Sequence, residues 1–505
     1  MALTLVQTKN GLFKGLPSYS NRVSVFKGIP YAKPPVGELR WKEPQPVEPW
    51  TGIYYADSYR AMPCQVIEGE EALFYGKGIW PAQEDCLYLN VWTPAEKPGE
   101  KLPVLVWIYG GSYRTGSITN LQVNGEGFAM RGVVMVSFNY RVGPIGFLCH
   151  PELATENDRN ICGNYGTLDQ IEALKWVHEN IDAFGGDPER ITLIGQSAGA
   201  HSVMTMCTTP LTKGYFQQAI IQSTAGLSAM YYQDEQSMED AEQEGIEYLA
   251  QLGVSSIKEA RKLDAMEITK KLIFAKTSTK APWFPKTDGY VLPLGTISSI
   301  MSGAYHKVHF LCGSNCSETG NMTGFLSKDP NRISWFANTF FKDDPEGYLK
   351  TVHAETESKV LQTVFEQYNN DKLTALLGWQ ALEASRGGNN FYQYYYTKPL
   401  PGPENYGACH GAELPYVFET MKETGRPFDG SDYDLSKTIT AYWTNFIKTG
   451  NPNGEGLPTW EKYDSKKDMF MELGKSVGMI KVPWNEQRHF IVDYMLKQAW
   501  KILEN

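Results

Sequence analysis

The chain has 505 residues, of which 42% are hydrophobic, 13% aromatic and 21% charged. This composition is typical of a globular protein with a large core and excludes a disordered chain. The 47 basic and 57 acidic residues give a net charge of −10. We therefore expect no nucleic-acid partner, because nucleic-acid binding relies on a basic surface.

The sequence shows neither a predicted membrane-spanning segment nor a recognisable signal peptide. No run approaches the roughly 20 apolar residues that a membrane-spanning helix requires. The first ten residues lack the basic and apolar segments of a signal peptide, so we expect a cytoplasmic protein. Eight cysteines in a chain of this length do not indicate a disulfide framework.

Short apolar runs bounded by Gly, Pro and Asn predict buried strands. They lie at Pro103–Tyr109, Val133–Asn139, Ile191–Ile194, Gln218–Gln222 and Val308–Cys312, and an aromatic strand follows at Phe391–Tyr396. Apolar residues at helical spacing predict helices at Thr167–Asp182, within 336–382, and at Glu486–Leu503. This alternation predicts an α/β fold with a large, mostly parallel central sheet flanked by helices.

The length alone would suggest roughly three domains. However, no Pro-, Gly- or Ser-rich linker separates the predicted elements. We therefore expect a single domain over residues 1–505, with a helical insertion around 320–385.

A candidate nucleophile lies in the sequence Gly195-Gln196-Ser197-Ala198-Gly199, between a predicted strand and a predicted helix. Gly-x-Ser-x-Gly at such a junction is typical of a sharp turn that presents the serine hydroxyl beyond the end of a sheet. The two glycines are needed because the turn brings these positions against neighbouring elements. The backbone N–H of Ala198, at the helix N-terminus, would face developing negative charge.

A glycine-rich loop follows another strand. Gly110-Gly111-Ser112 comes directly after Pro103–Tyr109, and esterases use such loops to present backbone N–H groups to an oxyanion. A diglycine alone is also consistent with a plain tight turn. Two such loops at strand ends favour a shared site.

Chain order selects the acid and the base, because in this architecture they follow the serine in the order acid, then histidine. The first carboxylate after the strand Val308–Cys312 is Glu318. Three later histidines remain, His353, His410 and His489. His410 is favoured because it lies in a loop, whereas the other two lie in helical patterns. His201, on the nucleophile helix, is better explained by packing.

Two motifs in the sequence resemble signatures of the type-B carboxylesterase family of α/β-hydrolases. They are Glu84-Asp-Cys-Leu-Tyr-Leu-Asn-Val-Trp-Thr-Pro94 and the run from Phe184 to Gly199, with supporting matches at Phe26–Gly37, Asn139–Gly143 and Trp443–Gly450. The resemblance implies a Ser197–Glu318–His410 triad and an oxyanion hole from Gly111, Ser112 and Ala198. It also implies a second serine, Ser223, near the acid, and no metal or organic cofactor.

The sequence departs from the family pattern at three places. Ser112 stands where a third glycine is usual, and Gln196 stands where a glutamate usually precedes the nucleophile. Cys64 and Cys86 resemble paired cysteines of secreted relatives, but we expect them to be reduced in a cytoplasmic protein.

Together these features predict a serine carboxylesterase that hydrolyses small-molecule esters through an acyl-enzyme. A lipase, an aromatic-acid (feruloyl-type) esterase and a non-catalytic adhesion or binding member of the family remain as alternatives. The sequence predicts neither the natural substrate nor the oligomeric state, because the pocket is assembled from distant loops.

Overall fold

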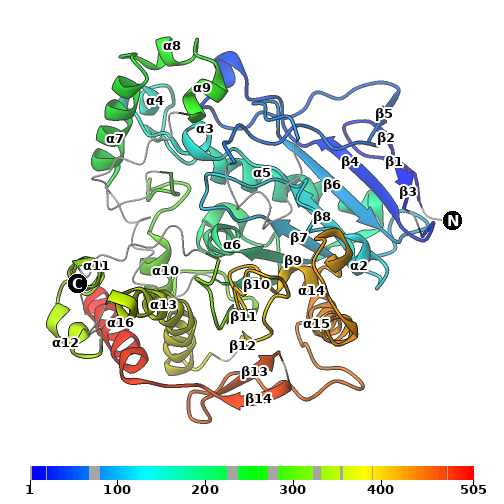
Figure 1. Cartoon of the computed structure of the whole chain (residues 1–505). Helices are drawn as coiled ribbons and strands as arrows, with labels where there is room; N and C mark the ends of the chain where they lie inside the picture. The colour runs from blue at the N-terminus through cyan, green and yellow to red at the C-terminus, as the bar shows by residue number, and fades with distance from the viewer. Residues whose placement is uncertain are drawn as a thin grey trace.

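The computed structural model describes residues 3–18, 20–67, 80–223, 237–270, 283–321, 331–352, 357–388, 391–474 and 476–504. Its centre is an 11-stranded sheet in the order β14-β13-β12-β11-β10-β9-β7-β8-β6-β4-β3 (Figure 1). Neighbouring strands from β8 to β13 are parallel, and those at both edges are antiparallel. This confirms the α/β fold with a mostly parallel sheet.

The strands of this sheet are β3 (Leu16–Pro17), β4 (Ser24–Pro30), β6 (Tyr88–Thr93), β7 (Leu102–Ile108), β8 (Val134–Phe138), β9 (Gly186–Gln196), β10 (Gln218–Gln222), β11 (His309–Asn315), β12 (Phe391–Tyr396), β13 (Met469–Leu473) and β14 (Val477–Lys481). A smaller sheet contains β1 (Leu5–Gln7), β2 (Leu12–Lys14) and β5 (Ile53–Tyr55).

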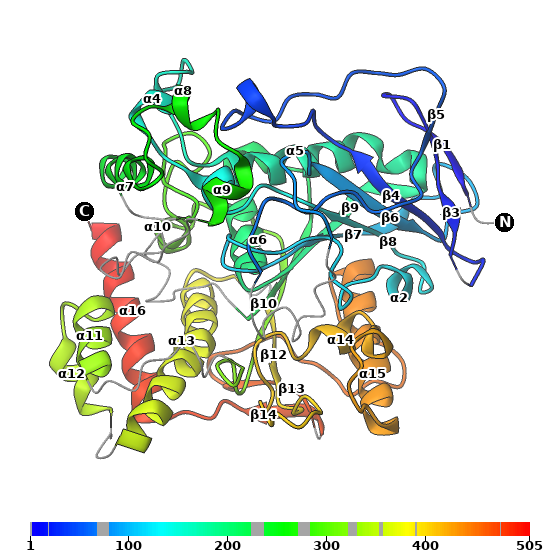
Figure 2. The same cartoon turned by 45° about the horizontal axis from the view of Figure 1, so that its top comes forward.

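Helices cover both faces of the central sheet (Figure 2). Helices α5 and α6 pack on one face, and α2, α14 and α15 lie on the other. The helices are α2 (Glu126–Ala129), α3 (Gly143–Phe147), α4 (Pro151–Ala154), α5 (Tyr165–Asn180), α6 (Ala198–Thr208), α7 (Met238–Gln251), α8 (Ile257–Ala260), α9 (Ala265–Lys270), α10 (Thr296–Ser302), α11 (Asn331–Phe340), α12 (Pro345–Lys350), α13 (Glu357–Ser385), α14 (Leu414–Val417), α15 (Gly430–Thr449) and α16 (Glu486–Glu504). Short 3-10 turns occur at η1 (Gly37–Leu39), η2 (Ile181–Phe184), η3 (Pro210–Thr212) and η5 (Met421–Glu423).

The predicted elements are present; β10 and β12 have the predicted ends, and the ends of the others are shifted. Strand β9 differs most, because it begins at Gly186 rather than near Ile191 and carries the polar run Asp187–Arg190. Pairing of Gly186 with Leu102 of β7, followed by a register shift, extends it. An apolar pattern cannot reveal such a segment. Helices α11, α12 and α13 lie between β11 and β12, while the single-domain organisation stays a prediction.

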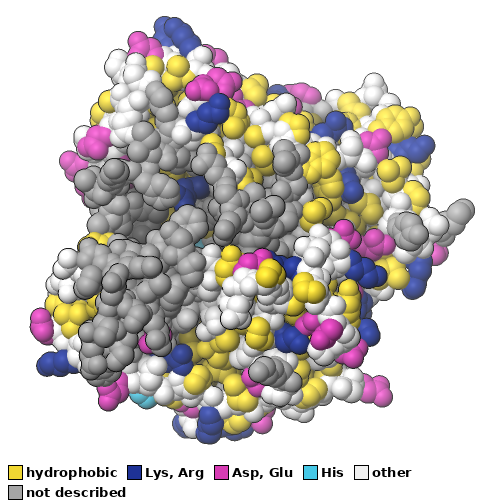
Figure 3. Space-filling model, viewed as in Figure 1, with side chains coloured by type: hydrophobic (Ala, Val, Ile, Leu, Met, Phe, Trp, Pro, Cys, Tyr) yellow, Lys and Arg dark blue, Asp and Glu magenta, His cyan; other side chains and the backbone are white. Residues whose placement is uncertain are grey.

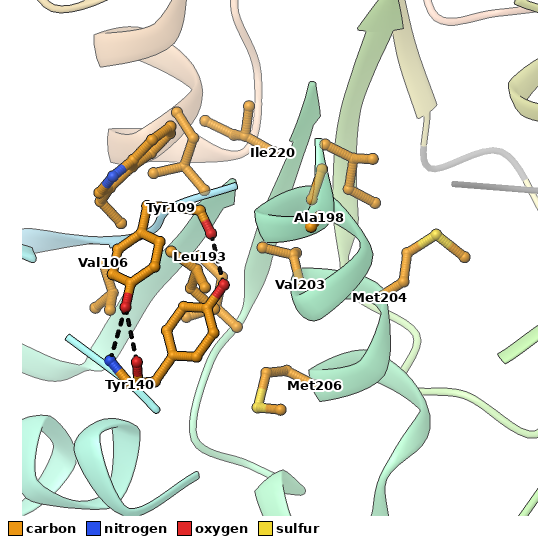
Figure 4. Close-up of a cluster of buried hydrophobic side chains, with 14 of the residues drawn as sticks. Val106, Tyr109, Tyr140, Leu193, Ala198, Val203, Met204, Met206 and Ile220 are labelled. Atoms are coloured by element: carbon orange, nitrogen blue, oxygen red, sulfur yellow. Dashed lines mark hydrogen bonds between the residues drawn. The ribbon is translucent and has the colours of Figure 1, made fainter. Parts of the chain in front are cut away.

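Helix α6 is buried along its whole length. It packs against β7, β9 and β10, so its residues apart from His201 are small or apolar all round, as expected for a central helix. Figure 4 shows Ala198, Val203, Met204 and Met206 of α6 within the apolar cluster that also includes Val106, Leu193 and Ile220. The start of α6 is therefore fixed by the core.

Two tyrosines join the ends of β7 and β8. The rings of Tyr109 and Tyr140 stack with centroids 4.4 Å apart (Figure 4). The Tyr109 hydroxyl donates to the Tyr140 carbonyl at 2.8 Å, and the Tyr140 hydroxyl donates to the Tyr109 carbonyl at 2.9 Å. These reciprocal bonds hold the strand end from which the Gly110–Ser112 loop departs.

On the face drawn in Figure 3, described acidic and basic side chains are interspersed between hydrophobic ones. Among the residues that the structure describes, no helix is both long and apolar enough to cross a membrane.

A buried ion pair connects the segment after β8 to helix α5. Arg141 donates to both carboxylate oxygens of Asp169 at 2.7 Å, and the Arg141 backbone N–H donates to the same carboxylate at 3.0 Å. Both side chains are almost fully buried. Because neither charge reaches water, each depends on the other for compensation.

We predict that Asp169→Ala lowers the free energy of unfolding by about 3–5 kcal/mol, because it leaves the Arg141 guanidinium buried and unpaired. Urea unfolding followed by fluorescence measures this. Asp434→Ala is the matched control, since Asp434 pairs with Lys437 at the surface and both side chains are largely exposed. Its effect should stay below about 1 kcal/mol. Equal effects for the two variants would contradict the prediction.

Candidate active site

Ser197 lies at the junction of β9 and α6. Its φ of 59° and ψ of −130° are unfavourable for a residue with a Cβ, as expected at a strained strand-to-helix turn. Its backbone N–H donates to the carbonyl of Gln222, at the end of β10, at 2.9 Å. Ser197 is partly exposed while its neighbours Gln196 and Ala198 are buried. The turn thus leaves the serine accessible at the edge of the core.

The two glycines of the motif occupy positions without room for a side chain. A Cβ on Gly195 would lie 2.3 Å from the carbonyl oxygen of Gly199, and a Cβ on Gly199 would lie 2.1 Å from that of Ile108. Both contacts are to backbone atoms, which cannot rotate away. Gly199 therefore lets α6 begin directly against the end of β7.

The Gly110–Ser112 loop meets this turn. A Cβ on Gly110 would lie 2.8 Å from the Cβ of Ser197. Gly111 has a φ of 125°, and Ser112 has a φ of 55°, so the serine adopts the left-handed conformation that glycine accepts more readily. Ser112 is exposed, and the backbone N–H of Ala198 is at the first position of α6. Gly110, which directly precedes Gly111 and Ser112, therefore lies against the turn that contains Ser197 and Ala198.

Tyr113, the residue after Ser112, anchors this loop by packing against helix α6. Its hydroxyl lies 2.7 Å from Nδ1 of His201 and accepts a hydrogen bond from Ser202 at 3.1 Å, both on α6. Its carbonyl accepts from the backbone N–H of Gly143 at 2.6 Å. His201 is buried, which agrees with a packing role. No local sequence pattern marks Tyr113, because its partners lie far along the chain.

Glu318 and His410 are in direct contact although 92 positions separate them. Nδ1 of His410 lies 2.6 Å from Oε2 of Glu318, and both side chains are buried. The other carboxylate oxygen accepts from the backbone N–H of Asn315, the last residue of β11, at 2.7 Å. The backbone N–H of His410 donates to the Glu318 carbonyl at 3.2 Å. This bond fixes the histidine loop on the acid loop.

Gln196 contacts the opposite side of the imidazole. Its Nε2 lies 3.1 Å from Nε2 of His410. With the His410 proton on Nδ1 and directed at Glu318, the Gln196 amide donates to the lone pair of Nε2. Gln196 thus occupies the side of the imidazole that faces away from Glu318.

A lysine from helix α13 is also part of the group, and the sequence reasoning missed it. Nζ of Lys372 lies 3.1 Å from Nδ1 of His410, 3.4 Å from Oε2 of Glu318 and 3.1 Å from the carbonyl oxygen of Ser223. Lys372 is buried and is followed along α13 by buried apolar residues. A lysine beside a run of apolar residues was the one sequence signal for a buried charge, but it does not indicate which residues the charge contacts.

Ser223 lies beside this group, with its backbone carbonyl 3.1 Å from Nζ of Lys372. It is buried, with a φ of 60°, and its backbone N–H donates to the carbonyl of Gly313 at 2.8 Å. Its carbonyl, rather than its hydroxyl, connects it to Glu318, through Lys372.

Burial and neighbouring charges together shift the pKa values of two buried carboxyl groups, Glu318 and Glu413. Burial alone would raise the pKa of Glu318, but the Lys372 ammonium and then His410 lower this pKa to about 2. Burial raises the pKa of Glu413, and the nearby Glu318 carboxylate raises it further, to about 7. Asn315 and Gln222 donate to Glu413 at 2.6 and 3.1 Å.

The imidazole itself is disfavoured as a cation. Burial lowers the pKa of His410, the Lys372 charge lowers it further, and Glu318 raises it in part. His410 is thereby kept neutral, which is the form that accepts a proton.

The other two candidate histidines and the two cysteines have different outcomes. His489 stacks on Trp484, and His353 lies outside the described residues. Cys64 and Cys86 are buried free thiols, and the cytoplasmic location stays a prediction. Within the described ranges, no three His, Cys, Asp or Glu side chains are grouped as metal ligands would be.

Comparison with known proteins adds evidence from the whole chain. The sequence model of the carboxylesterase family matches residues 2–491. The chain is 33% identical to fumonisin B1 esterase of Sphingopyxis macrogoltabida, over 93% of this chain and 86% of that protein. It is 33% identical to a medium-chain fatty acyl-CoA hydrolase precursor of Anas platyrhynchos, over 88% and 83%. It is 31% identical to carboxylesterase 4A of Bos taurus, over 94% and 92%.

We predict that Gln196→Glu moves the acidic limb of the kcat/KM profile to higher pH. A carboxylate beside Nε2 would stabilise the imidazolium and raise the pKa of His410, so protonation would remove the base at a higher pH. Gln45→Glu adds the same charge at an exposed position and should leave the profile unchanged. An acidic limb in Gln196→Glu that stays in place or moves to lower pH would refute this role of Gln196.

Proposed function

Because the chain belongs to the carboxylesterase family and is a carboxylic ester hydrolase, we propose that it cleaves its substrate through an acyl-enzyme on Ser197, with His410 as base and Glu318 as its partner. The observation that carries this proposal is the 2.6 Å contact between buried Glu318 and His410. It matches the acid–base half of a catalytic triad.

In the first half-reaction, Ser197 Oγ attacks the ester carbonyl carbon while Nε2 of His410 accepts the hydroxyl proton. For this step the Gln196 amide must give up its contact with Nε2. Glu318 holds the Nδ1–H and stabilises the imidazolium. His410 then returns the proton to the leaving alcohol as the tetrahedral intermediate collapses, leaving the acyl group on Ser197.

In the second half-reaction, a water molecule takes the place of the alcohol. His410 accepts a proton from this water as it attacks the acyl carbon, and then protonates Ser197 Oγ as the acid product leaves. The backbone amides of Gly111, Ser112 and Ala198 would bind the oxyanion in both half-reactions. Removing one such donor in other enzymes costs about 10²–10³ in turnover.

The substrate proposal is limited to small-molecule carboxylic esters. Two relatives are named for fumonisin B1 and for medium-chain fatty acyl-CoA, which is a thioester; a first substrate panel of both therefore also tests whether the enzyme is restricted to oxygen esters. Adding a p-nitrophenyl ester series of increasing acyl length would separate a short-chain esterase from a lipase.

We predict that Ser197→Ala lowers kcat for a p-nitrophenyl ester by a factor on the order of 10⁶, as loss of the nucleophile does in other serine hydrolases. A fluorophosphonate probe should label the unmodified enzyme at Ser197 and leave Ser197→Ala unlabelled. Ser302→Ala, at an exposed serine of α10, is the control and should retain full activity. Near-normal turnover by Ser197→Ala would overturn the proposal, and an unlabelled folded wild type would favour a non-catalytic role.

A further inference from the structure

Lys372 brings a positive charge into the buried region behind the proposed triad. Helix α13 packs against β11, the strand that precedes Glu318, and Lys372 reaches from this helix to the triad. Its side chain is only 10% exposed and its ammonium lies within 3.4 Å of both Glu318 and His410. The mechanism above gives this lysine no step, and a buried charge requires compensation.

We propose that Lys372 is a positioning residue that fixes the Glu318 carboxylate against His410 and opposes protonation of the imidazole. This inference rests on the proposed function, since it assigns a role within the Ser197–Glu318–His410 group.

The hydrogen-bond geometry distinguishes two kinds of contact at Nζ. The ammonium has donors only, so it donates to the Ser223 carbonyl and to Oε2 of Glu318. Nδ1 of His410 directs its own proton at the same Oε2, so its 3.1 Å approach to Nζ places two proton-bearing nitrogens side by side, and a second proton on the imidazole would place two positive charges there. Lys372 therefore attracts the acid and repels a proton on the base.

The other charged groups nearby do not cancel this effect. Glu318 faces both Lys372 and His410, and it is the carboxylate that favours the imidazolium. Glu413 lies behind Asn315 and its pKa of about 7 makes it neutral at lower pH. Burial raises the pKa of the neighbouring thiols of Cys316 and Cys409, which keeps them uncharged. Lys372 is thus the cation that acts directly on the acid–base pair within the described residues.

The sign of the effect on activity follows. Burial and the Lys372 charge both lower the pKa of His410. Neutralising residue 372 would remove the second of these and raise the pKa. Because activity is lost as pH falls through the pKa of the base, the acidic limb of kcat/KM would move to higher pH.

The experiment compares pH profiles of kcat/KM for a p-nitrophenyl ester, with fluorophosphonate titration giving the concentration of folded sites. Lys372→Gln removes the charge while keeping an N–H donor for the Ser223 carbonyl, and Lys372→Met removes both. We expect both variants to move the acidic limb to higher pH. We expect Lys372→Met also to lower the plateau of kcat/KM about tenfold, because it removes the hydrogen bond from the charged ammonium to the Ser223 carbonyl. Lys372→Arg keeps the charge and should restore the wild-type limb.

The matched control is Lys307→Met. Lys307 pairs at 2.9 Å with Glu383, which belongs to α13 like Lys372. Lys307 lies just before the start of β11, whereas Glu318 follows the end of that strand. It should lower stability without moving the limb. If Lys372 had a purely structural role, its variants would likewise lose stability while the acidic limb stayed in place.

Other outcomes are also decisive. An unchanged limb in Lys372→Gln, with Ser197→Ala inactive, would overturn the role of Lys372 and leave the proposed triad intact. An active Ser197→Ala would overturn both. A limb that disappears in Glu413→Gln and stays in place in the Lys372 variants would assign the titration to Glu413 instead.

Discussion

The site depends on the close approach of helix α6 to the end of strand β7. Gly199 leaves no space for a Cβ against the Ile108 carbonyl, and a Cβ on Gly110 would lie 2.8 Å from the Cβ of Ser197. This contact holds the nucleophile turn and the oxyanion loop together before any side chain is considered. The rest of the fold supports it, because the Tyr109–Tyr140 pair fixes the end of β7 and the buried core fixes α6. The strain at Ser197 and Ser112 is maintained by this packing.

The second half of the site has a different physical basis, which is charge in a region without water. Glu318 would be protonated more readily by burial alone, and it remains a carboxylate because Lys372, His410 and the Asn315 amide all stabilise its charge. Glu413, without an adjacent cation of this kind, is shifted in the opposite direction. Two buried carboxylates close in space thus differ in protonation because of their neighbours, so one can orient the histidine while the other serves as a hydrogen-bond partner.

Sequence patterns predicted the features that depend on the spacing of nearby residues, namely the buried strands and the turn at Ser197. The parallel strands have buried apolar runs, and the strand–Gly-x-Ser-x-Gly–helix order specifies the turn at Ser197. The pairing of Glu318 with His410 followed from chain order and a resemblance, and the 2.6 Å contact needed the structure. Lys372 was missed because it acts on residues distant in sequence, through tertiary packing that no period of 2 or 3.6 residues encodes. The polar start of β9 was missed for the same reason, since its partner strand determines it.

Two features shift the protonation of His410 in the same direction: glutamine rather than glutamate at position 196, and the presence of Lys372. The residue before the nucleophile contributes an amide rather than a carboxylate at Nε2, and the lysine contributes a cation at Nδ1. Both arrangements favour the neutral imidazole. A base that remains neutral to lower pH is also a weaker base, so stabilisation of the imidazolium during the reaction falls mainly to Glu318. In the proposed mechanism, the short Glu318–His410 contact therefore has to offset the nearby ammonium when His410 accepts the proton of Ser197.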